Sequence, residues 1–428
     1  LASSVGDGDS RMKHALLATA MCTAVPLHAT ADDRPSQIER SAMSLSPLPA
    51  PPPNPTNRVA DDPAAAVLGQ TLFFDPGLSR NGEISCATCH DPDKAFTDGK
   101  SVAEGLEVGT INTPTVLGAA HHRWLFLDGR ADTLWSQATS PIENDLEMGN
   151  ARTDVVRYVA GSDGLASQYT AIFGPLPDLS DQNRFPPTAR PGTPQWETML
   201  EEDRHRITKA YVNLGKAIEA YERLLAPGES SFDRWAASIE QGHRDDALIS
   251  PEALRGFELF AGDAGCTQCH FGLMISDLEF HDLALPPRDQ QAAPMPGRGA
   301  GYALLRKSEF RADGPWSDAP ESTRARRAAA ARIGPEHWGS FRTPSLRNVA
   351  RTAPYMHSGQ FRTLGEALAF YNTLEQQVRR HHHAEAVLQP LNFTPEQLAD
   401  LEAFLRSLNG GKTPKSLSQP LQPNGTAS

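Results

Sequence analysis

The chain has 428 residues, of which 39% are hydrophobic and 21% are charged. Its formal net charge at pH 7 is −12, and acidic and basic residues are interspersed, so it lacks the basic footprint of a nucleic-acid-binding protein. Beyond an expected leader and linker roughly 350 residues remain, which is more than one hydrophobic core usually serves. This length predicts two domains.

The N-terminal residues have the layout of a secretory signal peptide. A short basic start at residues 12–14 leads into an apolar run at residues 15–27 and then into A-T-A at residues 29–31, an A-x-A cleavage pattern. The run is shorter than the roughly 20 residues of a membrane-spanning helix. We therefore expect residues 12–31 to be a cleaved signal peptide and the protein to be exported to the periplasm, without a membrane span.

Proline-rich and polar residues dominate the next segment, residues 32–58, which includes the run L-P-A-P-P-P-N-P. Such a tract cannot pair in sheets or continue helices, so it predicts a disordered linker. The last residues, 412–428, are also expected to be disordered.

The motif C-x-x-C-H occurs twice, at residues 86–90 and 266–270. Two thiols three residues apart can bond the two vinyl groups of one haem while the adjoining imidazole binds its iron. A redox dithiol or a zinc site would explain one copy, but four zinc ligands would have to converge from pairs a domain apart. The fifth cysteine, Cys22, falls in the expected leader. We predict two covalent haems c, attached at Cys86, Cys89, His90, Cys266, Cys269 and His270.

Apolar residues at helical spacing predict helices at residues 64–74, 207–225, 254–260 and 395–408. The last of these begins with a capping sequence, T-P-E-Q, and is followed by two glycines.

The predicted fold is mainly α, with two helical domains like c-type cytochromes, each around one covalently bound haem. We place the N-terminal haem domain at residues 59–205 and the C-terminal haem domain at residues 206–411. A proline-rich loop at residues 175–193 indicates no function of its own.

Several short stretches resemble the bacterial di-haem cytochrome c peroxidase and MauG family. They are L-F-F-D-P at 72–76, A-F-T-D-G at 95–99, N-T-P-T at 112–115, D-G-R at 128–130, E-M-G at 147–149, F-R-T-P-S-L-R-N at 341–348 and T-A-P-Y-M-H-S-G at 352–359. They span nearly the whole mature chain in the family's order.

The resemblance implies a peroxide site at the first haem. Heterolytic cleavage of peroxide needs a group that removes a proton from one oxygen and delivers it to the other. The resemblance selects Glu147 for this proton transfer and Gln137 as the amide that orients peroxide. From the residues alone, both would be assigned to a solvated helix face.

The resemblance also implies ligands around the second haem. Tyr371, which alone would be called half-buried core, stands where family members place the sixth iron ligand; a phenolate there suits high-valent iron. One calcium ion is implied between the haems, bound by the Asn112 side chain and the carbonyls of Thr352 and Pro354, although these residues would equally form turns.

Two features depart from the family pattern. No histidine lies between His90 and His121, so we expect a first haem that reacts with peroxide without reductive activation. His121 and His122 are expected in a surface or loop segment. Whether one of this pair supplies a sixth ligand to the haem iron is left open. Leu127 stands where the family has a tryptophan between the haems. Trp124 could replace that relay, but core packing is its expected role.

Three functions remain. The first is a periplasmic peroxidase that reduces hydrogen peroxide to water with electrons from a small cytochrome c or cupredoxin. The second is a MauG-like oxidase that uses peroxide-derived ferryl haems to modify residues of a partner protein, and the third is a di-haem electron carrier. Tyr371 favours MauG, whereas Leu127 and Ala264, where MauG has a second tryptophan, do not. The resemblance allows a homodimer, while the residues leave the oligomeric state open.

Overall fold

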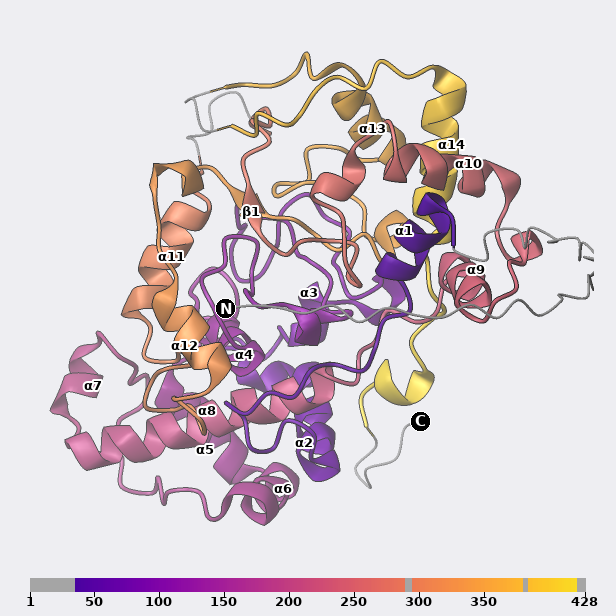
Figure 1. The fold of residues 1–428 in the computed structure, drawn as a ribbon. Helices are drawn as coiled ribbons and strands as arrows, with labels where there is room; N and C mark the ends of the chain where they lie inside the picture. Colours follow the sequence, from indigo (N-terminus) through magenta and orange to yellow (C-terminus); the bar gives the residue numbers. More distant parts are fainter. Residues whose placement is uncertain (1–34, 289–294, 380–383, 422–428) are drawn as a thin grey trace, which may run out of the picture. The chain divides into compact units, whose positions relative to one another are not determined.

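The computed structural model describes residues 35–288, 295–379 and 384–421 (Figure 1). The predicted signal peptide, residues 12–31, and Cys22 lie outside the described residues. Residues from Gln37 onward form one unit, built mainly from helices. None of the described helices is long and apolar enough to cross a lipid bilayer.

The α-helices are α1 Gln37–Leu45, α2 Pro63–Phe74, α3 Cys86–Cys89, α4 Leu134–Glu143, α5 Arg152–Gly161, α6 Asp163–Phe173, α7 Pro194–Thr198, α8 Glu201–Glu222, α9 Ser231–Glu240, α10 Pro251–Ala261, α11 Arg298–Lys307, α12 Thr323–Ala330, α13 Leu364–Thr373 and α14 Pro395–Ser407. Short 3-10 helices are η1 Pro76–Leu78, η2 Pro92–Lys94, η3 Ala119–His121, η4 Asp246–Leu248, η5 Cys266–Gln268, η6 Pro335–His337, η7 Val349–Arg351 and η8 Lys415–Leu417. The strands β1 Phe280–His281 and β2 Phe341–Arg342 pair antiparallel, with Phe280 opposite Arg342.

The first hydrophobic core lies where α2 crosses α8. Asp62 caps α2 by accepting from the Ala64 backbone N–H, and Pro63 occupies the first turn, where its missing N–H costs nothing. The helices approach so closely that a Cβ on Gly69 would lie 1.9 Å from the Ala217 carbonyl oxygen. α4 and α5 also pack against α8.

The second core repeats this arrangement with α10 and α14 (Figure 1). The predicted capping box is confirmed, because Thr394 accepts from the Gln397 N–H and Gln397 accepts from the Thr394 N–H. At the crossing, a Cβ on Gly256 would lie 1.9 Å from the Asp400 carbonyl oxygen. In each half, the helix that precedes the C-x-x-C-H motif is therefore fixed by a glycine crossing.

The boundary between the two cores differs from the predicted one at residues 205/206. That point lies inside α8, and α8 packs into the first core through Ile207, Tyr211 and Leu214. After α8, the next residue that belongs to the second core is Phe232 on α9. The amphipathic pattern of a long helix predicts that one face is buried, but it does not predict which of two cores buries that face.

The predicted disordered linker is ordered over residues 37–58, which corrects that expectation. Leu45 at the end of α1 is buried in the second core. Further on, the Asn54 amide donates to Glu219 on α8, and the carbonyl of Pro52 accepts from Arg223. A proline-rich chain lacks N–H donors, so it is fixed here through its side chains and carbonyls.

The expected disordered tail is also ordered up to residue 421. The Gln70 side chain donates to the Ser416 carbonyl, and the Tyr221 hydroxyl donates to the Leu417 carbonyl. The tail thereby packs against α2 and α8. Residues 422–428 lie outside the described part of the chain.

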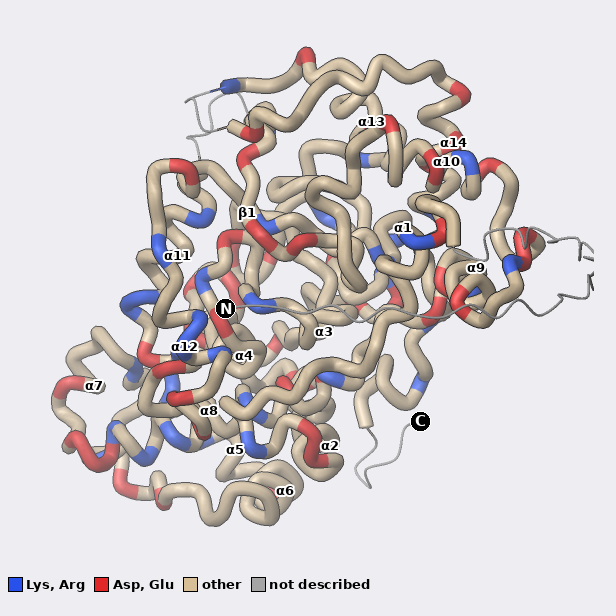
Figure 2. Tube along the Cα trace, in the orientation of Figure 1, with Lys and Arg blue, Asp and Glu red and all other residues tan. Residues whose placement is uncertain are grey.

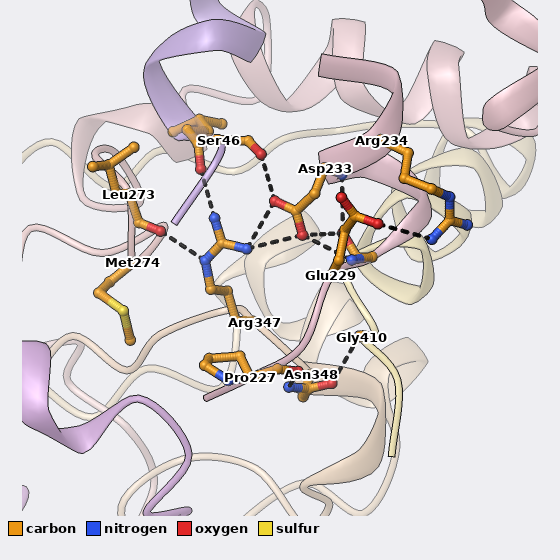
Figure 3. A network of polar contacts seen from close by, with 12 residues as sticks. Ser46, Pro227, Glu229, Asp233, Arg234, Leu273, Met274, Arg347, Asn348 and Gly410 are labelled. Carbon is orange, nitrogen blue, oxygen red and sulfur yellow. Dashed lines mark hydrogen bonds and ion pairs between the residues drawn. The ribbon is translucent and has the colours of Figure 1, made fainter. Parts of the chain in front are cut away.

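A buried ion pair ties distant segments together in the second half (Figure 3). The Arg347 guanidinium, 4% exposed as a residue, bonds Asp233 on α9 at 2.9 Å and also donates to the carbonyls of Leu45 and Leu273. Asp233 accepts from the Ser46 hydroxyl as well. One arginine thus joins α1, α9 and the loop that follows the second C-x-x-C-H motif.

Charged side chains of both signs are spread over both halves of the chain (Figure 2), as the composition indicates. A local excess of arginine occurs on α12, whose sequence is T-R-A-R-R-A-A-A.

We expect Gly256→Ala to destabilise the protein by about 1–3 kcal/mol, because its methyl group would force α10 away from α14. The matched control is Gly164→Ala in α6, where no atom lies within 4 Å of the added Cβ. That change should leave stability unchanged or raise it by up to about 1 kcal/mol. Urea unfolding of the holoprotein measures both, and equal midpoints for the two variants would contradict the close crossing.

Candidate functional site

The first motif holds its histidine in a defined orientation. α3 is a single turn, and the His90 backbone N–H donates to the Cys86 carbonyl at 2.8 Å. The His90 Nδ1 lies 3.1 Å from the Phe96 carbonyl oxygen, which can only accept, so Nδ1 carries the proton. Burial lowers the pKa of His90 and keeps the ring neutral. Nε2 is therefore left with a free lone pair, as an iron ligand requires.

The second motif repeats this geometry on η5. The His270 backbone N–H donates to the Cys266 carbonyl at 2.8 Å, and Nδ1 donates to the Ile275 carbonyl at 3.0 Å. Burial lowers the pKa of His270 as well. Both histidines thus carry the same tautomer with the same free atom.

The four motif thiols form no disulfide. Burial raises the pKa of the Cys89 thiol to about 11 and that of Cys269 to about 11. A catalytic dithiol needs a lowered pKa, so these cysteines are unsuited to thiol redox chemistry. Their chemistry fits the thioether bonds of haem c instead.

A largely apolar cavity of about 310 Å³ lies beside the second motif. Its wall includes both cysteines and the histidine of the motif, Tyr371 on α13, and leucines of α13 and α14, namely Leu364, Leu368, Leu401 and Leu405. An apolar wall of this kind suits the faces of a flat aromatic macrocycle.

Two polar groups in the wall of this cavity indicate that its occupant is anionic. Arg342 is 5% exposed, forms no ion pair with a described residue and reaches only the carbonyls of Phe126 and Thr343, each at 3.4 Å. Burial lowers its pKa to about 10. The Nε2 of His122 is buried without a hydrogen-bond partner. Because buried charges are normally paired, thiols, free imidazole nitrogen and cationic wall together fit haem c, which carries two carboxylates.

Glu147, which the resemblance selected for proton transfer, lies close enough to the first motif to act on Cys89. Its charge, after burial and Asp98, contributes to the raised pKa of the Cys89 thiol. The Asn144 amide donates to Glu147 Oε1 at 2.6 Å. Burial raises the pKa of Glu147, while Arg130 and this hydrogen bond oppose the rise.

A second, more polar cavity of about 280 Å³ adjoins this group. Its wall contains Arg130 and Asn144 together with Glu143, Ser140 and Phe310. Arg130 is held over the Phe126 ring at 3.5 Å and pairs with Asp128. Gln137 lies half-buried on α4, the helix that leads into Asn144. The contacts of Arg130 and Asn144 were missed from the sequence, although D-G-R was among the family motifs.

The loop at residues 175–193 contacts and stabilises the segment that carries Asn144 and Glu147. Arg190 at its end donates to the Glu143 carbonyl and forms a two-point ion pair with Asp145. Arg152, buried beneath the rings of Trp196 and Phe310, binds the Glu143 carboxylate. The segment that carries Asn144 and Glu147 is therefore fixed from two sides.

The departures from the family pattern lie as follows. Leu127 is buried and lines the cavity beside the second motif, in agreement with a position between the two motifs. Trp124 instead packs against Ala312, Ala325 and Ala328, with Arg298 over its ring at 4.3 Å. This location agrees with core packing. His122 is buried rather than at the surface, whereas His121 is half-buried.

Asn112, Thr352 and Pro354, the three residues selected for calcium, line one cavity. The Asn112 amide nitrogen donates to the Lys100 carbonyl at 2.7 Å, which directs its nitrogen away from any cation. A cluster that the sequence did not indicate lies nearby, where His281 bonds Asp277 and Glu385, each at 2.8 Å. These carboxylates raise the pKa of His281 to about 9.

Comparison with known proteins agrees with this geometry. The family model described as "Di-haem cytochrome c peroxidase" matches residues 63–241. The methylamine utilization protein MauG of Methylorubrum extorquens is 32% identical over 83% of this chain and 81% of its own length. The cytochrome-c peroxidase IdrP1 of Denitromonas iodatirespirans is 31% identical over 92% of both.

Among solved structures, the di-haem peroxidase BthA from Burkholderia thailandensis matches with a TM-score of 0.62 and 25% identity. The match covers 86% of this chain and 90% of that one. Sequence and fold therefore agree over nearly the same length. The chain belongs to the di-haem cytochrome c peroxidase and MauG family, and it is an oxidoreductase that acts on peroxide.

Proposed function

We propose that the protein is a periplasmic peroxidase that reduces hydrogen peroxide to water with electrons from a small cytochrome c or cupredoxin. The observation that carries the proposal is the group of Glu147, Asn144 and Arg130 beside the first motif, next to a polar cavity. The leader pattern at residues 12–31 and covalent haem attachment support the location. The reaction consumes one peroxide, two electrons and two protons and gives two waters.

In this proposal haem c, held by Cys86, Cys89 and His90, supplies the iron at which peroxide is reduced. Glu147 acts as the proton-transfer group. Asn144 occupies its Oε1, which leaves Oε2 to take a proton from one peroxide oxygen and return it to the other. Burial raises the pKa of this carboxyl, so proton uptake is easier than at a solvated glutamate. Gln137 orients peroxide, and the polar cavity admits peroxide and releases water.

At the second motif we propose Tyr371 as sixth ligand of the iron held by His270. The tyrosine and the histidine line one cavity, and burial raises the pKa of the Tyr371 hydroxyl, so without a metal the phenol keeps its proton. Deprotonation on metal binding would supply an anionic ligand. Calcium at Asn112, Thr352 and Pro354 remains part of the proposal, supported by their shared cavity.

A MauG-like oxidase that modifies a partner protein is the second candidate. Tyr371 and the 32% identity to MauG favour it. Leu127 and Ala264 argue against it, because both line the cavity beside the second motif and neither has a ring that could accept an electron vacancy.

The test of the proposal is stopped-flow spectroscopy of the as-isolated, oxidised holoprotein. We expect peroxide to react at once, without prior reduction, because no histidine lies between His90 and His121. Reduced cytochrome c added next should be oxidised over many turnovers. A long-lived oxidised state that cytochrome c discharges poorly would favour the partner-modifying oxidase, and no reaction with peroxide would contradict both.

Removing the carboxylate should slow the peroxide step selectively. We expect Glu147→Gln to lower the second-order rate constant for the reaction with peroxide by roughly 10²–10⁴-fold, the usual contribution of a positioned acid or base. The control is Glu107→Gln, which changes an exposed carboxylate on the adjoining loop. Equal rate constants for both glutamine variants would exclude Glu147.

Asn144→Ala removes a hydrogen bond that lowers the pKa of Glu147. The acid limb of the pH profile of this rate constant should therefore move to higher pH.

Loss of a phenolate ligand should be visible in the second haem alone. We expect Tyr371→Phe to change the absorption and electron paramagnetic resonance spectra of the oxidised protein and to raise the midpoint potential of one haem, because an anionic ligand favours ferric iron. Tyr355→Phe is the control, since Tyr355 lines the same cavity but donates its hydroxyl to the Val349 carbonyl at 3.1 Å. Unchanged spectra of Tyr371→Phe would exclude ligation.

A further inference from the structure

His122 is a buried imidazole that the proposed reaction does not use. The residue follows η3, is 6% exposed and lines the cavity that contains the second motif and Tyr371. Its Nε2 has no hydrogen-bond partner among the described residues. A buried polar atom without a partner destabilises the fold, so an atom of this kind that faces a cavity indicates a missing acceptor or donor.

The groups that face His122 define the charge of that partner. Arg342 on β2, Arg324 on α12 and the adjoining His121 act on it, and all three are cationic or become so. Together with burial they hold the pKa of His122 well below its ordinary value. A cation would be repelled here. A carboxylate, in contrast, would offset the buried charge of Arg342 and offer Nε2 an acceptor.

Protein carboxylates do not meet this need. No described acid forms an ion pair with Arg342, and no described acid contributes to the shift of the His122 pKa. Haem c bound at the second motif would supply two carboxylates of its own. The missing acceptor and the missing anion therefore have one source.

We propose that His122 is a positioning residue that donates a hydrogen bond from Nε2 to a carboxylate of the haem at the second motif. The inference rests on haem c at this motif. A hydrogen bond of this kind withdraws negative charge from the carboxylate and so favours ferrous over ferric iron. His122 thereby raises the potential at which the second haem accepts electrons, a role that assigns it neither catalysis nor iron ligation.

The experiment compares His122→Leu, His122→Gln and His121→Leu as full-length holoproteins. His122→Leu removes the donor, whereas His122→Gln keeps an N–H donor. His121 is the matched control, because it is the same residue type, is next in sequence and does not belong to the described wall of the cavity. Potentiometric titration followed by absorption gives the midpoint potential of each haem, and a pyridine haemochrome assay counts the haems.

We expect a lower midpoint potential for the second haem in His122→Leu, an intermediate value in His122→Gln and the wild-type value in His121→Leu. An unchanged potential in His122→Leu with two haems bound would overturn the inference. So would a loss of low-spin signal that marks His122 as an iron ligand. If His122→Leu fails to bind its second haem, the comparison of His122→Gln with His122→Phe tests the same contrast.

A crystal structure of the wild-type holoprotein would identify the hydrogen-bond partner of His122 Nε2 directly. A haem carboxylate oxygen within hydrogen-bond distance of Nε2 is the expected result, and a water molecule or protein carbonyl there would contradict it. The haem count separates this failure from a failure of the proposed cofactor. One haem per wild-type chain would refute haem at one motif, whereas two haems with an unaffected potential would refute only the role of His122.

Discussion

The buried ion pair between Arg347 and Asp233 is the contact on which the second half depends. Burying two charges costs more solvation free energy than an exposed pair would, so such a pair specifies an arrangement more than it adds stability. Here it does so through the remaining donors of Arg347, which bind the carbonyls of Leu45 and Leu273. The Leu273 loop continues to Ile275, whose carbonyl orients His270. The orientation of the His270 ring therefore depends on a loop that this buried charge pair holds in place.

Both halves use one local plan but surround it differently. In each, a helix fixed by a glycine crossing leads to two thiols, and a backbone carbonyl fixes the histidine tautomer. Around the first motif the chain supplies a half-buried carboxylate and the polar side chains of Arg130 and Asn144, which suit proton transfer. Around the second it supplies apolar walls, a tyrosine and an arginine, Arg342, that forms no ion pair with a described residue. The two motifs are thus alike in their local geometry and differ in the side chains that surround them.

Sequence patterns predicted the parts of this structure that depend on local chemistry. The helix at residues 64–74, the capping box at Thr394 and both motifs agree with the structure because caps, periodicity and ligand spacing act within a few residues. The order of residues 37–58 and the burial of His122 were not predicted. Both depend on segments far along the chain: Glu219 binds Asn54, and Arg342 lines the same cavity as His122. Composition carries no information about such contacts. The roles of Glu147 and Tyr371 came from family resemblance, since an isolated glutamate or tyrosine has no local signature.

The position of α1 near the N-terminus affects the order in which the parts of the molecule can fold. The first core closes with α8, so it can form once about half of the chain has been synthesised, whereas Leu45 and Ala42 of α1 belong to a core that also needs α14 near the other end. Such a contact has a very large sequence separation and carries a high entropic cost until its partners exist. The first described helix is therefore among the last to dock. A chain interrupted before α14 would lack part of the core that buries Leu45 and would leave this apolar side chain more exposed to solvent.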